Sequence, residues 1–202
     1  MSTSAITATD RSDFRNVLVS GTKVGLLTAV AVIGYLAVFR LLPAGLGREG
    51  VLALVVLAAA VTAGLWPGTL AAARNVEGIA GAAAIGLWGS VSFSVIDVAL
   101  LRPFHAYPWT WDAIGGGSSW WYLPVWWMLG TFIAWMGGML TAGRHARGAA
   151  TLGGVALPVV IGAVVLGGAG KVLGCPVMLP VLVGGGFAVS LTALALLSLR
   201  RV

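Results

Sequence analysis

Charged residues are scarce in this sequence. Asp, Glu, Lys and Arg make up only 9% of its 202 residues, hydrophobic residues make up 59%, and the mean hydropathy is +0.99. A soluble domain needs many more charged side chains to cover its surface. The composition therefore excludes an ordinary soluble fold and predicts an integral membrane protein.

Cysteine and histidine are also scarce, which limits the possible cofactors. The single cysteine, Cys175, excludes an intrachain disulfide and a multi-cysteine cluster. A membrane haem is normally held by a histidine within a span, whereas His105 and His145 fall in polar segments between apolar runs. Neither has a second His, Cys or acid nearby at metal-ligand spacing. We therefore predict no haem, no metal and no other cofactor.

Enzyme motifs are missing as well. The sequence contains no HExxH, no GxSxG and no Cys–His pairing. Ser90, Ser92 and Ser94 lie in an apolar run without a base beside them, so a serine nucleophile is not expected. We predict that the chain is not an enzyme.

The positive net charge has another explanation than nucleic-acid binding. The chain carries a net charge of +6 and has a pI near 10.5. Its cations are scattered singly between apolar runs and form no basic patch or stripe. Such a distribution is typical of membrane topology, so we predict no nucleic-acid partner.

Long apolar runs predict an all-α, polytopic transmembrane helical bundle. Residues 1–16 form a polar tail, and residues 17–202 form a single transmembrane domain. About 20 apolar residues are needed to cross roughly 30 Å of hydrocarbon. Six segments have this length: about 17–42, 51–73, 77–101, 120–142, 152–173 and 177–199. The turn at 174–176 is so short that the last two segments could instead be broken or re-entrant.

Lys and Arg are divided unequally between the two sides of this predicted bundle. With the N-terminus inside, eight lie on the inner side: Arg11, Arg15, Lys23, Arg74, Arg144, Arg147, Arg200 and Arg201. Four lie on the outer side: Arg40, Arg48, Arg102 and Lys171. Cytoplasmic segments carry the excess of Lys and Arg. We therefore predict an inner (plasma) membrane protein with both termini in the cytoplasm.

Small residues recur every four positions in three of the predicted spans. These ridges are Gly21, Gly25 and Ala29 in the first span; Ala82, Gly86, Ser90 and Ser94 in the third; and Gly130, Ala134, Gly138 and Ala142 in the fourth. Small residues on one helix face let another backbone approach closely. The ridges predict tight helix–helix packing.

One acidic residue lies within a predicted span. Asp97 falls within about 60° of arc from Ser90 and Ser94, so the acid extends a polar stripe along the third span. A carboxylate at such a depth is costly and tends to be kept for a reason. Arg40 ends the first span at a similar depth, so we expect a buried or interfacial Asp97–Arg40 ion pair. A proton or ion site and an intersubunit contact remain alternatives.

Tryptophan is concentrated around the predicted outer loop. Seven of the nine tryptophans lie within residues 102–138. The cluster is Trp109, Trp111, Trp120, Trp121, Trp126 and Trp127. Tryptophan prefers the membrane–water interface, and aromatic anchors also dominate protein-binding surfaces. The cluster is thus an interfacial belt, a docking surface for a partner, or a lid over a quinone or lipid pocket.

Two functions agree with these patterns. The first is an accessory or structural subunit of a larger inner-membrane complex, such as an energy-transducing one, with membrane lipids and other membrane subunits as partners. The second is a small-solute or proton-coupled transporter or channel that uses Asp97 with the Ser90 and Ser94 stripe. Six spans could form an inverted three-plus-three repeat, but the two halves show no convincing sequence match.

Overall fold

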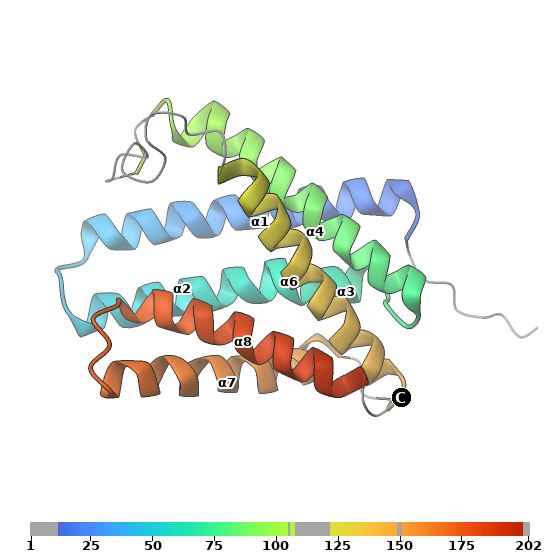
Figure 1. Cartoon of the computed structure of the whole chain (residues 1–202). Coiled ribbons are helices and arrows are strands. Elements are labelled where there is room, and N and C mark those ends of the chain that lie inside the picture. Colours follow the sequence, from blue (N-terminus) through green and yellow to red (C-terminus); the bar gives the residue numbers. More distant parts are fainter. Residues whose placement is uncertain (1–11, 105, 108–121, 149–150, 200–202) are drawn as a thin grey trace, which may run out of the picture.

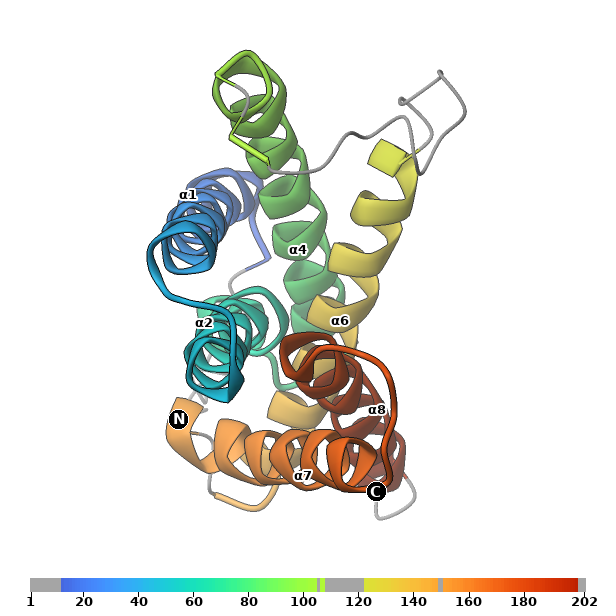
Figure 2. The same cartoon turned by 90° about the vertical axis from the view of Figure 1, so that its left-hand side faces the viewer.

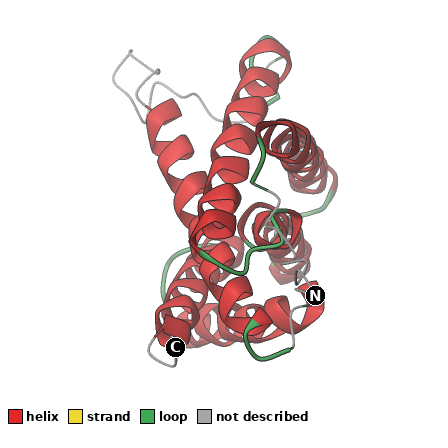
Figure 3. Cartoon of the chain, turned by 90° about the vertical axis from the view of Figure 1, so that its right-hand side faces the viewer, coloured by secondary structure: helices red, strands yellow, loops and turns green. Residues whose placement is uncertain are grey.

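The computed structural model describes residues 12–104, 106–107, 122–148 and 151–199, and the described chain is helical without strands (Figures 1 and 3). The elements are α1 (Phe14–Leu41), α2 (Leu46–Gly64), α3 (Trp66–Leu70), α4 (Val76–Ile96), the π-helical turn η1 (Asp97–Leu101), α6 (Tyr122–His145), α7 (Leu152–Val172) and α8 (Leu179–Leu199). Counting α2 with α3 and α4 with η1, six stretches are long and apolar enough to cross a membrane. The predicted all-α class with six membrane-length helices is confirmed.

Polar side chains set where several helices begin. The Asp13 carboxylate accepts a hydrogen bond from the backbone N–H of Asn16, so α1 begins at Phe14, three residues before the predicted start. Asn75 caps α4 in the same way, and Thr151 caps α7. Each cap satisfies an N–H that has no partner within the helix.

The predicted second span is divided into two helices. α2 ends at Gly64, the chain bends at Leu65, and Pro67 lies in the first turn of α3. Proline is tolerated there because the first turn of a helix does not need its N–H. After α3 the chain reverses through Ala72, which has a φ of 49°.

The last two segments are complete helices. α7 and α8 are joined through residues 173–178, where Gly174 has a φ of 76° that favours glycine. The two helices pack against each other along their length (Figure 1). Pro158 lies inside α7 without ending it.

The helices form one connected bundle. Within it, α4 and α8 each contact several of the other helices. α4 lies between α1 and α6, whereas α8 contacts α2, α6 and α7 (Figure 2). The larger apolar core joins α2, α6, α7 and α8, and includes Leu57, Met136, Val159 and Phe187. A smaller core joins α1, α3 and α4.

The bundle has two distinct ends (Figure 1). The start of α1, the α3–α4 turn, the α6–α7 turn and the end of α8 share one end, which we call the terminal end. The α1–α2 connection, η1 and the α7–α8 connection share the other, which we call the loop end.

The small-residue ridges pack against one another inside the chain. A Cβ added at Gly25 of α1 would lie 2.7 Å from the Gly89 carbonyl oxygen of α4. A Cβ at Gly86 of α4 would clash with Ala134 and approach the Gly130 carbonyl of α6 to 2.7 Å. The ridges therefore serve contacts between α1, α4 and α6.

The closest approach is between α6 and the end of α2. A Cβ at Gly137 would clash with the Gly64 carbonyl oxygen. We expect Gly137→Ala to destabilise the protein by roughly 1–3 kcal/mol, because α2 and α6 would have to separate. The measurement is the Tm of the purified protein in detergent, followed by tryptophan fluorescence.

Gly185→Ala is the matched control for this substitution. Gly185 is also within a long helix, but a Cβ there meets nothing within 4 Å. Since alanine is the better helix former, this variant should keep or slightly raise the Tm. Equal Tm values for the two variants would contradict the proposed contact.

Candidate polar site at the loop end

The site begins where α4 changes its helical geometry. Beyond Ile96 the chain forms η1, and the Arg102 N–H donates to the Asp97 carbonyl, five residues back, at 3.0 Å. In a π-helix residues five apart lie one turn apart. The π-helical turn therefore places the Arg102 side chain next to that of Asp97.

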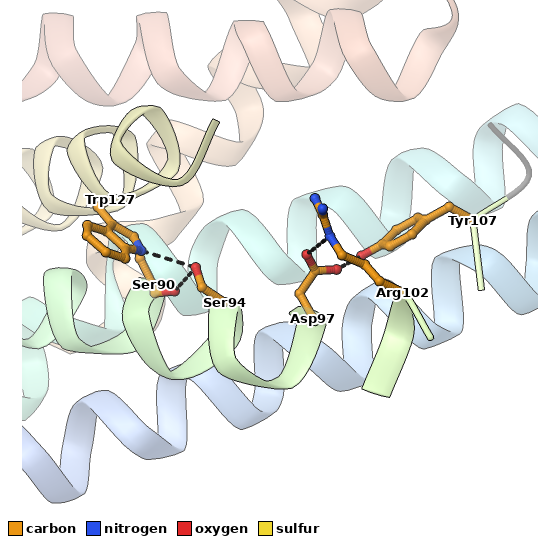
Figure 4. A network of polar contacts seen from close by, with 6 residues as sticks. All are labelled: Ser90, Ser94, Asp97, Arg102, Tyr107 and Trp127. Atoms are coloured by element: carbon orange, nitrogen blue, oxygen red, sulfur yellow. Dashed lines mark hydrogen bonds and ion pairs between the residues drawn. The ribbon is translucent and has the colours of Figure 1, made fainter. Parts of the chain in front are cut away.

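Asp97 is the centre of the site (Figure 4). The residue is only 3% exposed. Its Oδ2 accepts from Arg102 Nε at 3.0 Å, and its Oδ1 accepts from the Tyr107 hydroxyl at 2.5 Å. Removing a carboxylate from water is costly unless a counter-charge and hydrogen bonds replace the hydration. Arg102 and Tyr107 supply both.

Arg40 reaches the same region from α1. Its Nη2 donates to the carbonyl oxygen of Ala106 at 2.6 Å, next to Tyr107 in the chain. The end of α1 is thereby tied to the segment that supplies the Tyr107 hydroxyl. A direct Asp97–Arg40 ion pair stays a prediction, and the contacts of Asp97 with Arg102 and Tyr107 were not identified from the sequence.

Ser94 and Ser90 form a second polar group, about one and two turns before Asp97 along α4 (Figure 4). The Ser90 hydroxyl donates to the Gly86 carbonyl at 3.0 Å, and the Ser94 hydroxyl donates to the Ser90 carbonyl at 2.8 Å. The indole N–H of Trp127 donates to Ser94 Oγ at 3.1 Å and so joins α6 to α4. Because both hydroxyl protons are bonded within α4, neither serine donates to Asp97, and Ser94 joins α4 to α6 only as the acceptor from Trp127.

The predicted tryptophan surface is described only in part. Trp126 is 45% exposed, whereas Trp127 is half-buried and bonded to Ser94. Trp109, Trp111, Trp120 and Trp121 lie outside the described residues.

A second ionic cluster at the loop end was not identified from the sequence. Glu49, in the first turn of α2, accepts from Lys171 Nζ of α7 at 2.9 Å and from the Leu179 N–H of α8 at 3.0 Å. One carboxylate thus holds three helices and also satisfies a free N–H at the start of α8. The available signal was that Glu49 directly follows Arg48, and that Arg48 and Lys171 were both assigned to the outer side.

The Asp97 contacts predict a loss of stability on neutralisation. In Asp97→Asn the charge opposite Arg102 is lost, which should cost about 1.5–3 kcal/mol. Adding Arg102→Gln to that variant should cost less than Arg102→Gln alone, since the pair is already broken. Thermal unfolding of the unmodified protein, the two single variants and the double variant gives the coupling energy between Asp97 and Arg102.

Glu77→Gln is the control, because it makes the same change at an exposed acid in the first turn of α4. It should change the stability by no more than roughly 0.5 kcal/mol. If the stability losses of Asp97→Asn and Arg102→Gln simply add up in the double variant, the Asp97–Arg102 ion pair contributes nothing to stability.

The contacts of Glu49 with Lys171 and Leu179 (the Glu49 cluster) predict a graded loss of stability when Glu49 is replaced. Glu49→Gln removes the charge opposite Lys171, but its amide oxygen can still accept from the Leu179 N–H. Glu49→Ala removes both interactions, so its Tm should be the lower of the two. Identical Tm values for Gln and Ala would rule out a contribution from the hydrogen bond to α8.

Comparison with known proteins adds no relative: no protein-family model, no curated protein and no solved structure matches this chain.

Proposed function

We propose that this chain is a non-catalytic accessory or structural subunit of a larger inner-membrane complex, such as an energy-transducing one. Its partners would be other membrane-embedded subunits and membrane lipids. The chain would have both termini in the cytoplasm, because the excess of Lys and Arg then lies inside.

The packing in the middle of the bundle is the observation that carries this proposal. The Gly64–Gly137 and Gly86–Gly130 contacts bring helix backbones together, and the larger core beside them is apolar. The buried hydroxyl of Thr141 donates to the Gly137 carbonyl of its own helix. A translocation site needs polar groups facing a cavity near mid-depth. The packing therefore favours a scaffold over a pathway for solutes.

The exposed face of α6 supports a docking role. Between Val125 and Trp135 it presents large apolar side chains: Val125 (50% exposed), Trp126 (45%), Met128 (72%), Leu129 (42%), Phe132 (39%) and Trp135 (47%). Because the small-residue ridges of α1, α4 and α6 are used within the chain, a partner would meet this aromatic face. The Trp-rich segment at 109–121 directly precedes it.

One observation favours the alternative, a small-solute or proton-coupled transporter or channel. Asp97 is buried and starts a π-helical turn, and such turns are frequent at functional sites. In this alternative Asp97 would exchange a proton or bind an ion, and the Ser90 and Ser94 stripe would lie on its path.

Gentle extraction from the native membrane tests the two functions. We expect the chain to co-migrate with a fixed set of larger subunits in size-exclusion chromatography, with mass spectrometry to identify them and an absorption spectrum to detect any pigment. A lone monomer or homo-oligomer would contradict the subunit proposal. Transport by reconstituted vesicles, lost in Asp97→Asn with unchanged assembly, would then support the alternative.

A further inference from the structure

The cations at the loop end are all engaged within the chain. Arg102 pairs with Asp97, and Lys171 pairs with Glu49. Arg40 donates to the Ala106 carbonyl. Arg48 donates to the Phe39 carbonyl at 3.4 Å, and its guanidinium lies 4.8 Å from the centre of the Phe39 ring. Of these four cations, two are thus neutralised by acids and two are hydrogen-bonded to backbone carbonyls.

The terminal end is different. Among the described residues, five cations lie there on three elements: Arg15 and Lys23 on α1, Arg74 in the α3–α4 turn, and Arg144 and Arg147 at the α6–α7 turn. Their side chains make no hydrogen bond or ion pair within the described residues. All are exposed except Arg144, which is half-buried. We call these five residues the basic collar.

Acidic residues at the terminal end do not neutralise the basic collar. The described acids there are Asp13 and Glu77. The Asp13 carboxylate caps α1 through the Asn16 N–H, and Glu77 lies exposed in the first turn of α4. A negative charge at either position is stabilised by the positive end of a helix dipole. The described part of the terminal end therefore carries five cations and two acids, and both acids lie at helix N-termini.

Lys23 shows at which depth the collar acts. It lies nine residues after Phe14, about 13 Å along α1 at 1.5 Å per residue. Its exposed neighbours on the helix surface are apolar: Val19 is 48% exposed and Leu26 is 52% exposed. Helical side chains lean toward the N-terminus, so the Lys23 stem covers apolar surface while its ammonium extends toward the terminal end. A lysine within a span that extends in this way can place its ammonium among lipid headgroups.

We infer that the basic collar binds the headgroups of anionic phospholipids in the leaflet at the terminal end. Arginine recognises phosphate oxygens through paired N–H donors, and lysine acts as a point charge. Basic residues beside membrane helices attract anionic lipid at about 1 kcal/mol each. The inference goes beyond the proposed function and does not depend on it, since it requires only insertion in a membrane.

The test compares two lipids on the full chain. The purified protein in detergent receives either phosphatidylglycerol or phosphatidylcholine, and the Tm is followed by tryptophan fluorescence, with native mass spectrometry to count retained lipids. We expect phosphatidylglycerol to raise the Tm more and to be retained, and the difference to shrink at high salt. Replacing all five collar residues with Gln should abolish the difference between the lipids.

A charge-preserving variant is the control. Arg15→Lys, Arg74→Lys, Arg144→Lys and Arg147→Lys together, with Lys23 kept, should retain the preference for phosphatidylglycerol. A preference that survives the five Gln substitutions would overturn the inference. So would an equal response of the unmodified chain to both lipids, which would leave an acidic surface of a partner subunit as the occupant. Neither outcome bears on co-migration in native membranes, so the two proposals fail separately.

Discussion

Backbone contact at glycine is the constraint on which the rest of this bundle depends. Lipid tails are as apolar as leucine, so helices in hydrocarbon gain little from burying apolar side chains and must associate through close contact. The Gly64–Gly137 and Gly86–Gly130 contacts join α2, α4 and α6 in this way. The apolar core around Phe187 then fills the space between these helices and α8.

Close packing in the middle leaves the charged groups at the two ends of the bundle, where they differ in kind. At the loop end, Asp97 pairs with Arg102, and Glu49 pairs with Lys171 and joins α2, α7 and α8. At the terminal end, the basic collar has no such partners among the described residues. Counting Lys and Arg along the sequence gives the number of cations on each side of the membrane. It does not show which of them already have partners within the chain.

The helices and their contact faces could be predicted from the sequence because helical periodicity is a local property. Glycine at every fourth position identified the faces of α1, α4 and α6 that meet. The partners of Asp97 could not be predicted in this way. On an α-helix, Arg102 would lie about 140° around the axis from Asp97. In η1 each turn closes over five residues, one more than in an α-helix, and this brings the two side chains together. The Glu49 cluster depends on how α2, α7 and α8 pack, which no local pattern contains.

The Glu49 cluster also has a consequence for the order of assembly. Lys171 lies 122 residues after Glu49, and Leu179 lies 130 residues after it. Chains are synthesised from the N-terminus, so α2 enters the membrane long before either partner exists. Until the last two helices arrive, the Glu49 carboxylate depends on water or headgroups for its hydrogen bonds. A chain that stops after α6 therefore carries an unmatched acid at its membrane surface, a chemical mark by which an incomplete product differs from the finished bundle.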